Sequence, residues 1–257
     1  MKKLTVIKVG GKIVEEENTL ASLLTDFSSI EGYKVLIHGG GRSATHIATL
    51  LGIESKMVEG RRITDAETLK VVTMVYGGLV NKNIVAGLQK LGINALGLTG
   101  ADMAVIKSDK RPVKDIDYGY VGDVKSVDGK LLANLIEQGV VPIVAPLSFS
   151  SEYGLLNTNA DTIAAETAKA LSYFFDVTLT YCFEKKGVLM DENDDDSVIP
   201  TITPDLFLKY KSENIIQGGM IPKLENAFDA LNGGVSKVVI TKASELGQNT
   251  GTVVVKS

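Results

Sequence analysis

Short apolar segments rich in valine and isoleucine recur along the chain. Both faces of each segment are apolar, which is typical of strands buried inside a parallel sheet. These segments cover residues 4–9, 34–37, 95–98, 140–145, 177–183, 237–241 and 252–255. The longest apolar runs, such as residues 140–147, fall well short of the roughly 20 residues that a helix needs to cross a bilayer.

Amphipathic segments of helical period lie between several of these strands. They cover residues 44–51, 66–91, 131–138, 161–171 and 223–231. Thr64 followed by Glu67 fits a capping box, so the long helix is expected to begin near Asp65. Gly233 and Gly234 follow the last helix, where a left-handed stop is expected. Strands that alternate with helices predict an α/β fold whose mainly parallel sheet is covered on both faces.

Two segments without periodicity carry many charges, so we expect them outside the regular elements. Residues 109–122 are predicted to form a hairpin or a loop excursion, and residues 192–205 a surface loop. The acidic run 194–196 is interpreted as a solvated turn in preference to a metal site. A soft division near residue 175 separates a predicted amino-terminal lobe, 1–175, from a carboxy-terminal lobe, 176–257, within one continuous folded unit.

Composition and charge narrow the possible functions. Of the 257 residues, 44% are apolar, which is enough for one large core or for two lobes that share a sheet. Lys and Arg number 27 against 31 Asp and Glu, and no basic stripe is present, so nucleic acid is not an expected partner. The single cysteine, Cys182, cannot form an intramolecular disulfide, and Met1 leads directly into a predicted strand without a signal peptide. We therefore expect a soluble, cytoplasmic protein.

Glycines follow two of the predicted strands, at the place where ligands bind in open parallel sheets. Gly10-Gly11 follows the first strand, and Gly39-Gly40-Gly41 lies between the second strand and a helix predicted to begin near Ser43. Glycine lets backbone N–H groups approach an anion closely, and a helix amino terminus adds partial positive charge. The pattern favours a phosphate site, although either turn could use its glycines only to bend tightly.

The same glycines allow a dinucleotide-binding interpretation. The run from Gly39 to Ala44 formally satisfies the dinucleotide fingerprint with alanine in its last place, and Glu59 follows at a suitable distance. The run follows the second strand instead of the first, and Glu59 does not end a convincing strand, so the match is weak. No Walker-type run of glycine, lysine and hydroxyl residues occurs in the sequence.

Two lysines occupy positions where they could hold an anion. Lys8 lies in an otherwise apolar strand just before a glycine turn, so its ammonium group is expected to point toward the ligand end of the sheet. An exposed lysine at the sheet edge is the alternative. Lys223 follows Gly218-Gly219 and Pro222 on the predicted first turn of a helix, where a cation opposes the helix dipole unless an anion lies nearby.

A polar loop and an arginine pair offer further groups. Asn159 and Asp161 could simply cap and stabilise the following helix, but with Asn157 they also offer amides to a substrate and a carboxylate that could hold two lysines. Arg62 could bind a substrate carboxylate through two parallel hydrogen bonds. One of the two arginines, Arg61 or Arg62, could be merely solvated. The spacing of His38 and His46 does not fit metal ligands or a nucleophile pair, so packing or hydrogen-bonding roles are expected.

Five motifs follow one another in a specific order. They are Lys8-Val9-Gly10-Gly11, His38-Gly39-Gly40-Gly41, Gly60-Arg61-Arg62-Ile63-Thr64, Asn157-Thr158-Asn159-Ala160-Asp161 and Gly219-Met220-Ile221-Pro222-Lys223. Together they resemble the acetylglutamate kinases of the amino-acid kinase superfamily, and the resemblance spans essentially the whole chain. The arginine and double-asparagine motifs resemble the acylglutamate branch more than the carbamate, aspartate, glutamate or UMP kinases.

The resemblance implies a three-layer α/β/α sandwich that phosphorylates the side-chain carboxylate of N-acetyl-L-glutamate with ATP, in arginine or ornithine biosynthesis. The amino-terminal lobe would bind the acylglutamate and the carboxy-terminal lobe the ATP, whose oxygens and water would hold Mg²⁺ without a dedicated set of protein ligands. The catalytic residues implied are Lys8, Lys223 and Asp161, and the substrate-binding residues are Gly40, Gly41, Arg62, Asn157 and Asn159. The ATP-binding residues implied are Gly10, Gly11, Glu184, Gly187, Ile215, Gln217 and Gly219.

The sequence departs from the family pattern after the strand at 177–183, where Glu184 replaces the usual aspartate. The nucleotide contacts of Glu184 and of residues 215–217 therefore rest on the part of the chain that matches the family pattern least. Arg61 leaves an acidic acyl group such as succinyl open. The chain lacks the additional amino-terminal helix that accompanies arginine-inhibited hexamers in this family, so we expect an arginine-insensitive homodimer. The alternatives are a non-catalytic nucleotide or metabolite sensor on the same scaffold and a kinase for another small acid.

Overall fold

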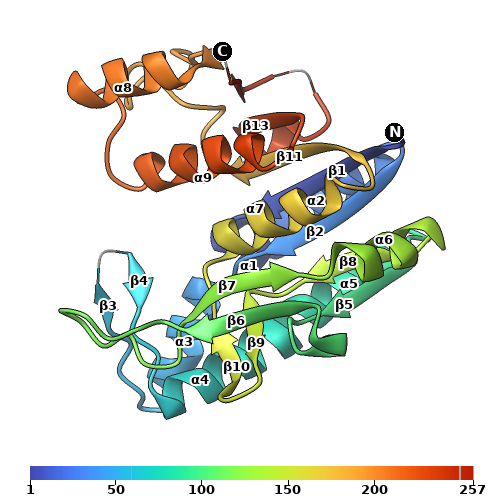
Figure 1. Cartoon of the computed structure of the whole chain (residues 1–257), viewed down its shortest axis with the longest axis vertical. Helices are drawn as coiled ribbons and strands as arrows, with labels where there is room; N and C mark the ends of the chain where they lie inside the picture. The colour runs from blue at the N-terminus through green and yellow to red at the C-terminus, as the bar shows by residue number, and fades with distance from the viewer. Residues whose placement is uncertain (59, 249, 257) are drawn as a thin grey trace.

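An eight-stranded sheet forms the middle layer of the computed structural model (Figure 1), which describes residues 1–58, 60–248 and 250–256. Its strands, in spatial order, are β12 (Thr201–Ile202), β14 (Thr252–Val254), β13 (Lys237–Lys242), β11 (Asp176–Phe183), β1 (Lys3–Val9), β2 (Tyr33–His38), β8 (Val141–Val144) and β5 (Ala95–Leu98). Neighbouring strands are parallel except for β13 and β14, which are antiparallel. The predicted strands and the mainly parallel sheet are confirmed.

Helices cover both faces of this sheet, which confirms the three-layer α/β/α arrangement (Figure 1). One face carries α6 (Gly129–Glu137), α7 (Ala160–Leu171) and α9 (Met220–Asn232), with α8 (Pro204–Ser212) packed on α9. The other face carries α1 (Gly11–Glu15), α2 (Glu17–Ser29), α3 (Gly41–Leu50), α4 (Ala66–Val72), the π-helical segment η1 (Thr73–Val80) and α5 (Asn81–Lys90). Two short 3₁₀ turns, η2 (Asp102–Ala104) and η3 (Ala243–Glu245), complete the helical elements of the described ranges.

Side chains alternate between the two faces along each strand, which divides the core in two. Leu4 and Val6 of β1 belong to the core under α7 and α9. Ile7 and Val9 of the same strand belong to the core under α2, α3 and α5. The next even-numbered residue of β1 is Lys8, so the pleat of this strand directs Lys8 toward the α7 face.

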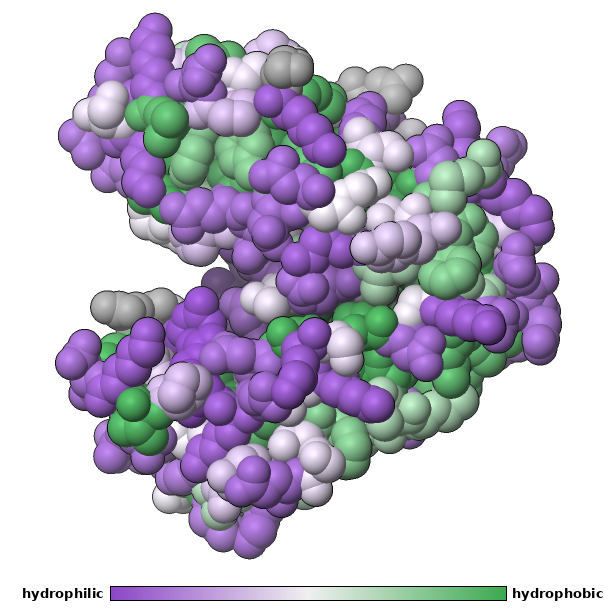
Figure 2. Space-filling view, viewed as in Figure 1, coloured by the Kyte–Doolittle hydropathy of each residue, from purple (hydrophilic) through white to green (hydrophobic). Residues whose placement is uncertain are grey.

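A smaller sheet and a two-stranded hairpin lie beside the main sheet (Figure 1). The smaller sheet has the order β10 (Gly154–Asn157), β9 (Leu147–Ser150), β6 (Ile106–Lys110) and β7 (Gly122–Val127), and the hairpin joins β3 (Met57–Val58) to β4 (Arg61–Arg62). Figure 2 shows a hollow with a largely hydrophilic rim that opens between the carboxy-terminal part of the chain and the part carrying this hairpin.

Several local predictions need correction. The N-cap of α4 is Asp65, whose carboxylate accepts the Thr68 N–H at 2.8 Å, so the capping box from Thr64 to Glu67 is wrong although the helix begins where expected. The segment predicted as one helix over 66–91 contains the π-helical segment η1. The predicted surface loop 192–205 also contains β12 and the start of α8. Residues 109–122 connect β6 to β7 and confirm the predicted hairpin.

The continuous helix from Ala66 to Lys90 is long and apolar enough to cross a membrane by length and composition alone. Its side chains at Val71, Val75, Ile84 and Leu88 are buried in the core beside α2 and α3, however. The apolar character of this helix is therefore explained by packing inside the folded chain.

Candidate active site

Lys8, Asp161 and Lys223 meet where β1, α7 and α9 converge. Lys8 lies near the end of β1, Asp161 in the first turn of α7, and Lys223 near the start of α9. The Lys8 Nζ atom lies 2.7 Å from Asp161 Oδ1, and the Lys223 Nζ atom lies 3.4 Å from Asp161 Oδ2. The structure thus brings together the three residues that the resemblance implies as catalytic.

The carboxylate between the two lysines is almost completely buried. Burial alone would raise the pKa of Asp161, but the positive charges of Lys8 and Lys223 outweigh that effect and lower it below the usual value. Asp161 therefore carries its charge at neutral pH. Lys223 retains more solvent access than Lys8, with 26% of its side chain exposed against 10%, and its ammonium group also lies over the Phe183 ring.

Asn159 caps helix α7 and so fixes the start of the helix that carries Asp161. Its side-chain oxygen accepts hydrogen bonds from the backbone N–H groups of Asp161 at 2.7 Å and Thr162 at 3.1 Å. This confirms the structural interpretation of Asn159 as an N-cap. The same residue also lines a cavity, so the capping role and a contact with a ligand do not exclude one another.

The two glycine turns pack against each other backbone to backbone. A β-carbon on Gly39 would lie 2.8 Å from the Gly11 nitrogen, a distance that side chains do not tolerate. A β-carbon on Gly11 would lie 3.2 Å from the Gly40 nitrogen and 3.3 Å from the Gly41 nitrogen. Both nitrogens therefore lie close to Gly11, on the side where a side chain would stand. Gly41 also begins α3, so the turn combines free N–H groups with a helix amino terminus.

A cavity of about 200 Å³ lies beside these turns. It is lined by all five residues that the resemblance implies as substrate-binding, namely Gly40, Gly41, Arg62, Asn157 and Asn159. The Arg62 guanidinium donates to the Gly41 carbonyl at 2.7 Å, to Thr45 Oγ1 at 2.8 Å and to Ser55 Oγ at 2.8 Å. Asn157 donates to Thr64 Oγ1 at 2.9 Å. Both polar groups are thus held in place by their neighbours.

The sequence reasoning missed the apolar wall of this cavity, which Met57, Tyr76, Val121 and Pro146 form. The Tyr76 ring lies against Gly40, where an added β-carbon would come within 3.0 Å of it. Burial raises the pKa of Tyr76, and the nearby Arg62 charge only partly offsets this. The available sequence signal was Gly77-Gly78 inside a predicted helix, since glycine pairs in helices mark irregular turns.

A larger cavity of about 840 Å³ adjoins the first and shares Gly41, Met57 and Arg62 with it. Five of the predicted ATP-binding residues line this cavity, namely Gly10, Gly11, Glu184, Gln217 and Gly219. The other two, Gly187 and Ile215, line a cavity of about 110 Å³ that shares Gln217 with the larger one. Lys223 lines the larger cavity, and Asn159 and Ala160, which directly precede Asp161, line the smaller one.

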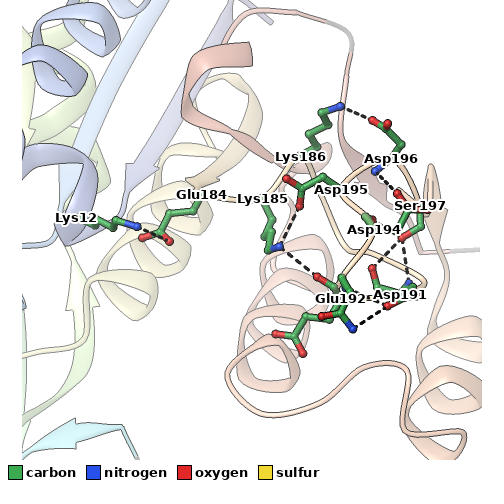
Figure 3. Close-up of polar contacts among 11 residues, drawn as sticks. Lys12, Glu184, Lys185, Lys186, Asp191, Glu192, Asp194, Asp195, Asp196 and Ser197 are labelled. Atoms are coloured by element: carbon green, nitrogen blue, oxygen red, sulfur yellow. Dashed lines mark hydrogen bonds and ion pairs between the residues drawn. The ribbon is translucent and has the colours of Figure 1, made fainter.

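Three ion pairs lie around the end of β11, and the first of them lines the larger cavity (Figure 3). Lys12 of α1 lies 3.0 Å from Glu184, which follows β11. Lys185 and Lys186 then pair with Asp195 and Asp196 of the acidic run. These carboxylates are exposed, which agrees with a solvated turn, and the described residues contain no group of three or more potential metal ligands.

The two histidines differ in environment. His46 is exposed on α3, whereas His38 is completely buried and hydrogen-bonded to Asn81. A hydrogen-bonding role is therefore confirmed for His38. Glu59, on which the dinucleotide interpretation relied, lies outside the described residues.

Known proteins are similar to this chain over nearly its whole length. Residues 3–242 match the model of the amino acid kinase family. An acetylglutamate kinase from Phocaeicola vulgatus is 72% identical over 254 residues, which are 99% of each chain. Its counterpart from Methanopyrus kandleri is 40% identical over 255 residues, which cover 98% of this chain and 100% of the relative.

Solved structures give the same fold. The protein smu.665 from Streptococcus mutans superposes with a TM-score of 0.82 at 28% identity, covering 99% of both chains. Carbamate kinase from Giardia lamblia bound to AMP-PNP has a TM-score of 0.73 at 15% identity, covering 99% of this chain and 98% of its own, and shows the fold alone. The family model matches residues 3–242, and the Phocaeicola vulgatus relative aligns over 99% of each chain. The chain therefore belongs to the amino acid kinase family.

Proposed function

We propose that the chain transfers the γ-phosphoryl group of ATP to the side-chain carboxylate of N-acetyl-L-glutamate. The observation that carries this proposal is the contact of two lysines with one buried carboxylate, where Lys223 lines the larger cavity and the residues just before Asp161 line the smaller one. Full-length relatives at 70–72% identity that are named acetylglutamate kinase support it. The proposed product is an acyl phosphate, which places the reaction in arginine or ornithine biosynthesis.

The chemistry requires alignment and charge neutralisation more than proton transfer. A carboxylate oxygen of the substrate attacks the γ-phosphorus, a new O–P bond forms, and the bond to the β–γ bridging oxygen breaks to release ADP. Because the attacking carboxylate is already ionised, no general base is needed. Lys8 and Lys223 neutralise the negative charge on the migrating phosphoryl group, while Asp161 holds both lysines in register.

Each of the two adjoining cavities binds one of the two substrates. Arg62 and Asn157 bind the acylglutamate in the smaller cavity, with Asn159 beside it, and Gly11, Gly40 and Gly41 offer N–H groups to the phosphoryl oxygens. ATP occupies the larger cavity as its magnesium complex, so the ion arrives as part of the substrate and ATP oxygens and water supply most of its ligands. Glu184, Gln217 and Ile215 lie along the nucleotide.

The positive charges around the smaller cavity bear on which acyl group the substrate carries. Arg61 lines the same cavity as Arg62, so a second positive charge is available to an acidic acyl group such as succinyl. A hydroxamate-trapping assay with ATP and Mg²⁺ decides by comparing N-acetylglutamate, N-succinylglutamate, free glutamate, aspartate and carbamate. Product from N-acetylglutamate supports the proposal. Product only from the unacylated acids contradicts it, and ATP binding without any turnover favours a sensor.

The expected assembly and location remain parts of the proposal. We propose a cytoplasmic homodimer that arginine does not inhibit. Light scattering that shows hexamers, or inhibition by arginine in the kinase assay, contradicts it.

A further inference from the structure

His38 ends strand β2 on the face opposite Lys8 and occupies a fully buried position between the glycine turn and helix α5. Its Nδ1 atom lies 2.7 Å from the carbonyl oxygen of Gly39, and its Nε2 atom lies 3.1 Å from Asn81 Nδ2. His38 and Asn81 do not line the smaller cavity, but Gly39 does. The motif comparison gave His38 no role in the site, yet its ring touches the backbone of the turn that lines the site.

The two contacts define the protonation of the ring. A carbonyl oxygen can only accept, so Nδ1 must carry the hydrogen, and in a neutral imidazole Nε2 is then an acceptor. The Asn81 amide group satisfies that acceptor and also donates to the Ile143 carbonyl at 3.0 Å. The Ile143 carbonyl can only accept, so the NH₂ group of Asn81 must lie beside both Ile143 and His38. The Asn81 oxygen then points elsewhere and is buried without a hydrogen-bond partner.

The contact with Gly39 sets the direction of the next N–H group. In a trans peptide the carbonyl and the following N–H point in opposite directions. Since the Gly39 carbonyl is turned toward His38, the Gly40 N–H is turned away from it. The Gly40 and Gly41 nitrogens both lie beside Gly11, on the side where a side chain would stand. Among the described residues, neither of these two N–H groups is paired with a backbone carbonyl.

The π-helical segment lets one helix support both sides of this peptide. Tyr76 lies within η1 and Asn81 directly follows it, five residues later. Residues five apart diverge by roughly 140° in an α-helix, whereas the wider turn of i→i+5 hydrogen bonding brings them closer to the same side of the helix. Tyr76 can thus pack on Gly40 while Asn81 anchors His38.

We propose that His38, held as its Nδ1–H tautomer by Asn81, is a positioning residue that aims the Gly40 N–H at the transferred phosphoryl group. This inference rests on the proposed kinase activity. It predicts that losing the Nδ1 contact lowers kcat more than it raises KM, because the Gly40 N–H contributes most when charge develops in the transition state.

Two polar replacements separate the two contacts of the ring. His38→Asn places an amide close to the position of Nδ1 and keeps a donor for the Gly39 carbonyl, whereas His38→Gln reaches toward Asn81 and loses that donor. His38→Leu removes both contacts. We expect kcat to fall roughly 10- to 100-fold in the Gln and Leu variants and less than about 5-fold in the Asn variant, with both KM values within about 3-fold.

Circular dichroism and thermal unfolding of each variant show whether loss of activity is loss of fold. A folded Leu variant with wild-type kcat overturns the inference, as does a Gln variant that is more active than the Asn variant. Side-chain ¹⁵N NMR of the wild-type protein, which needs no variant, is expected to show a neutral ring protonated at Nδ1. A ring protonated at Nε2 overturns the inference even if every variant unfolds. Absence of wild-type turnover in the substrate panel instead refutes the proposed function.

Discussion

Lys8 and Lys223 contact opposite oxygens of the same buried carboxylate, that of Asp161. One lysine comes from a central strand and the other from a helix near the carboxy terminus, so only the folded chain brings them together. A carboxylate that holds two cations side by side leaves their remaining N–H donors free for a phosphoryl group. The ion pairs that hold Lys8, Asp161 and Lys223 together thus also place the two ammonium groups for the proposed catalysis.

Removing either ammonium group should abolish most of the activity. We expect Lys8→Ala and Lys223→Ala to lower kcat by roughly 10²- to 10³-fold, the loss typical of a missing charge-stabilising donor. Lys34 is the matched control, because it is also buried but, within the described part of the chain, donates only to the carbonyls of Phe27, Ser28 and Ile30. Lys34→Met should lower the free energy of unfolding and leave kcat of the folded enzyme unchanged. Wild-type turnover in either lysine variant contradicts the assigned roles.

Arg62 should act mainly on acylglutamate binding. Its guanidinium is fixed by Ser55, Thr45 and the Gly41 carbonyl beside the smaller cavity. Arg62→Ala is expected to raise KM for the acylglutamate about 10-fold or more, which corresponds to about 1.4 kcal/mol of lost binding. KM for ATP should change far less, and Arg62→Lys should recover little because a lysine cannot form the planar fork. Steady-state kinetics with each substrate varied in turn tests this, and equal increases in both KM values contradict it.

Lys12 should assist ATP binding although the motif comparison did not select it. Its pair with Glu184 is half-exposed on the wall of the larger cavity (Figure 3). Such exposed pairs contribute only about 0–1 kcal/mol, so an ATP phosphate can displace Glu184 from Lys12. We expect Lys12→Ala to raise KM for ATP roughly 5- to 10-fold and to leave KM for the acylglutamate unchanged.

Lys186 is the control for this change. It forms a similar exposed pair with Asp196 in the same region but does not line the larger cavity (Figure 3). Lys186→Ala removes the same charge and should leave KM for ATP within about 2-fold. If both variants raise KM for ATP equally, general charge explains the effect and Lys12 has no specific contact.

The sequence allowed the central part of the site to be predicted, for reasons visible in single residues. Lys8 continues the even-numbered positions of Leu4 and Val6, so the pleat alone directs it to the α7 face. The glycine turns could be predicted because their backbones pack so closely that Gly39, which would bring a β-carbon to 2.8 Å from the Gly11 nitrogen, must be glycine. Local pattern and motif order therefore located the lysines and the phosphate-facing turn.

The wall of the smaller cavity could not be predicted in the same way. Tyr76 packs on Gly40 from within η1, which departs from α-helical spacing, whereas the sequence pattern predicts a regular helix there. The hydrogen bonds from Arg62 to Thr45 and Ser55 depend on how the β3–β4 hairpin lies beside α3, which is a tertiary feature. Helices α1, α2 and α8 were likewise missing from the predicted elements.

His38 should make the stability of the protein depend on pH below neutrality. Burial lowers the pKa of His38 from 6.5 to about 4, so between these values the unfolded chain binds a proton that the folded chain does not. The free energy of unfolding should therefore decrease as the pH falls through this window. From pH 7.5 to 5.0 the contribution of this one group is about 2 kcal/mol, since one pKa unit corresponds to about 1.4 kcal/mol.

Urea unfolding of the wild type and of His38→Asn at pH 7.5 and 5.0 measures this contribution as the difference between their pH dependences. His46→Asn is the control, because His46 is exposed on α3 and the substitution removes a histidine without disturbing the core. The Asn variant at position 38 should lose about 2 kcal/mol of pH dependence, while the variant at position 46 should retain the wild-type dependence. If the wild type and His38→Asn lose stability in parallel as the pH falls, His38 is not held neutral by burial.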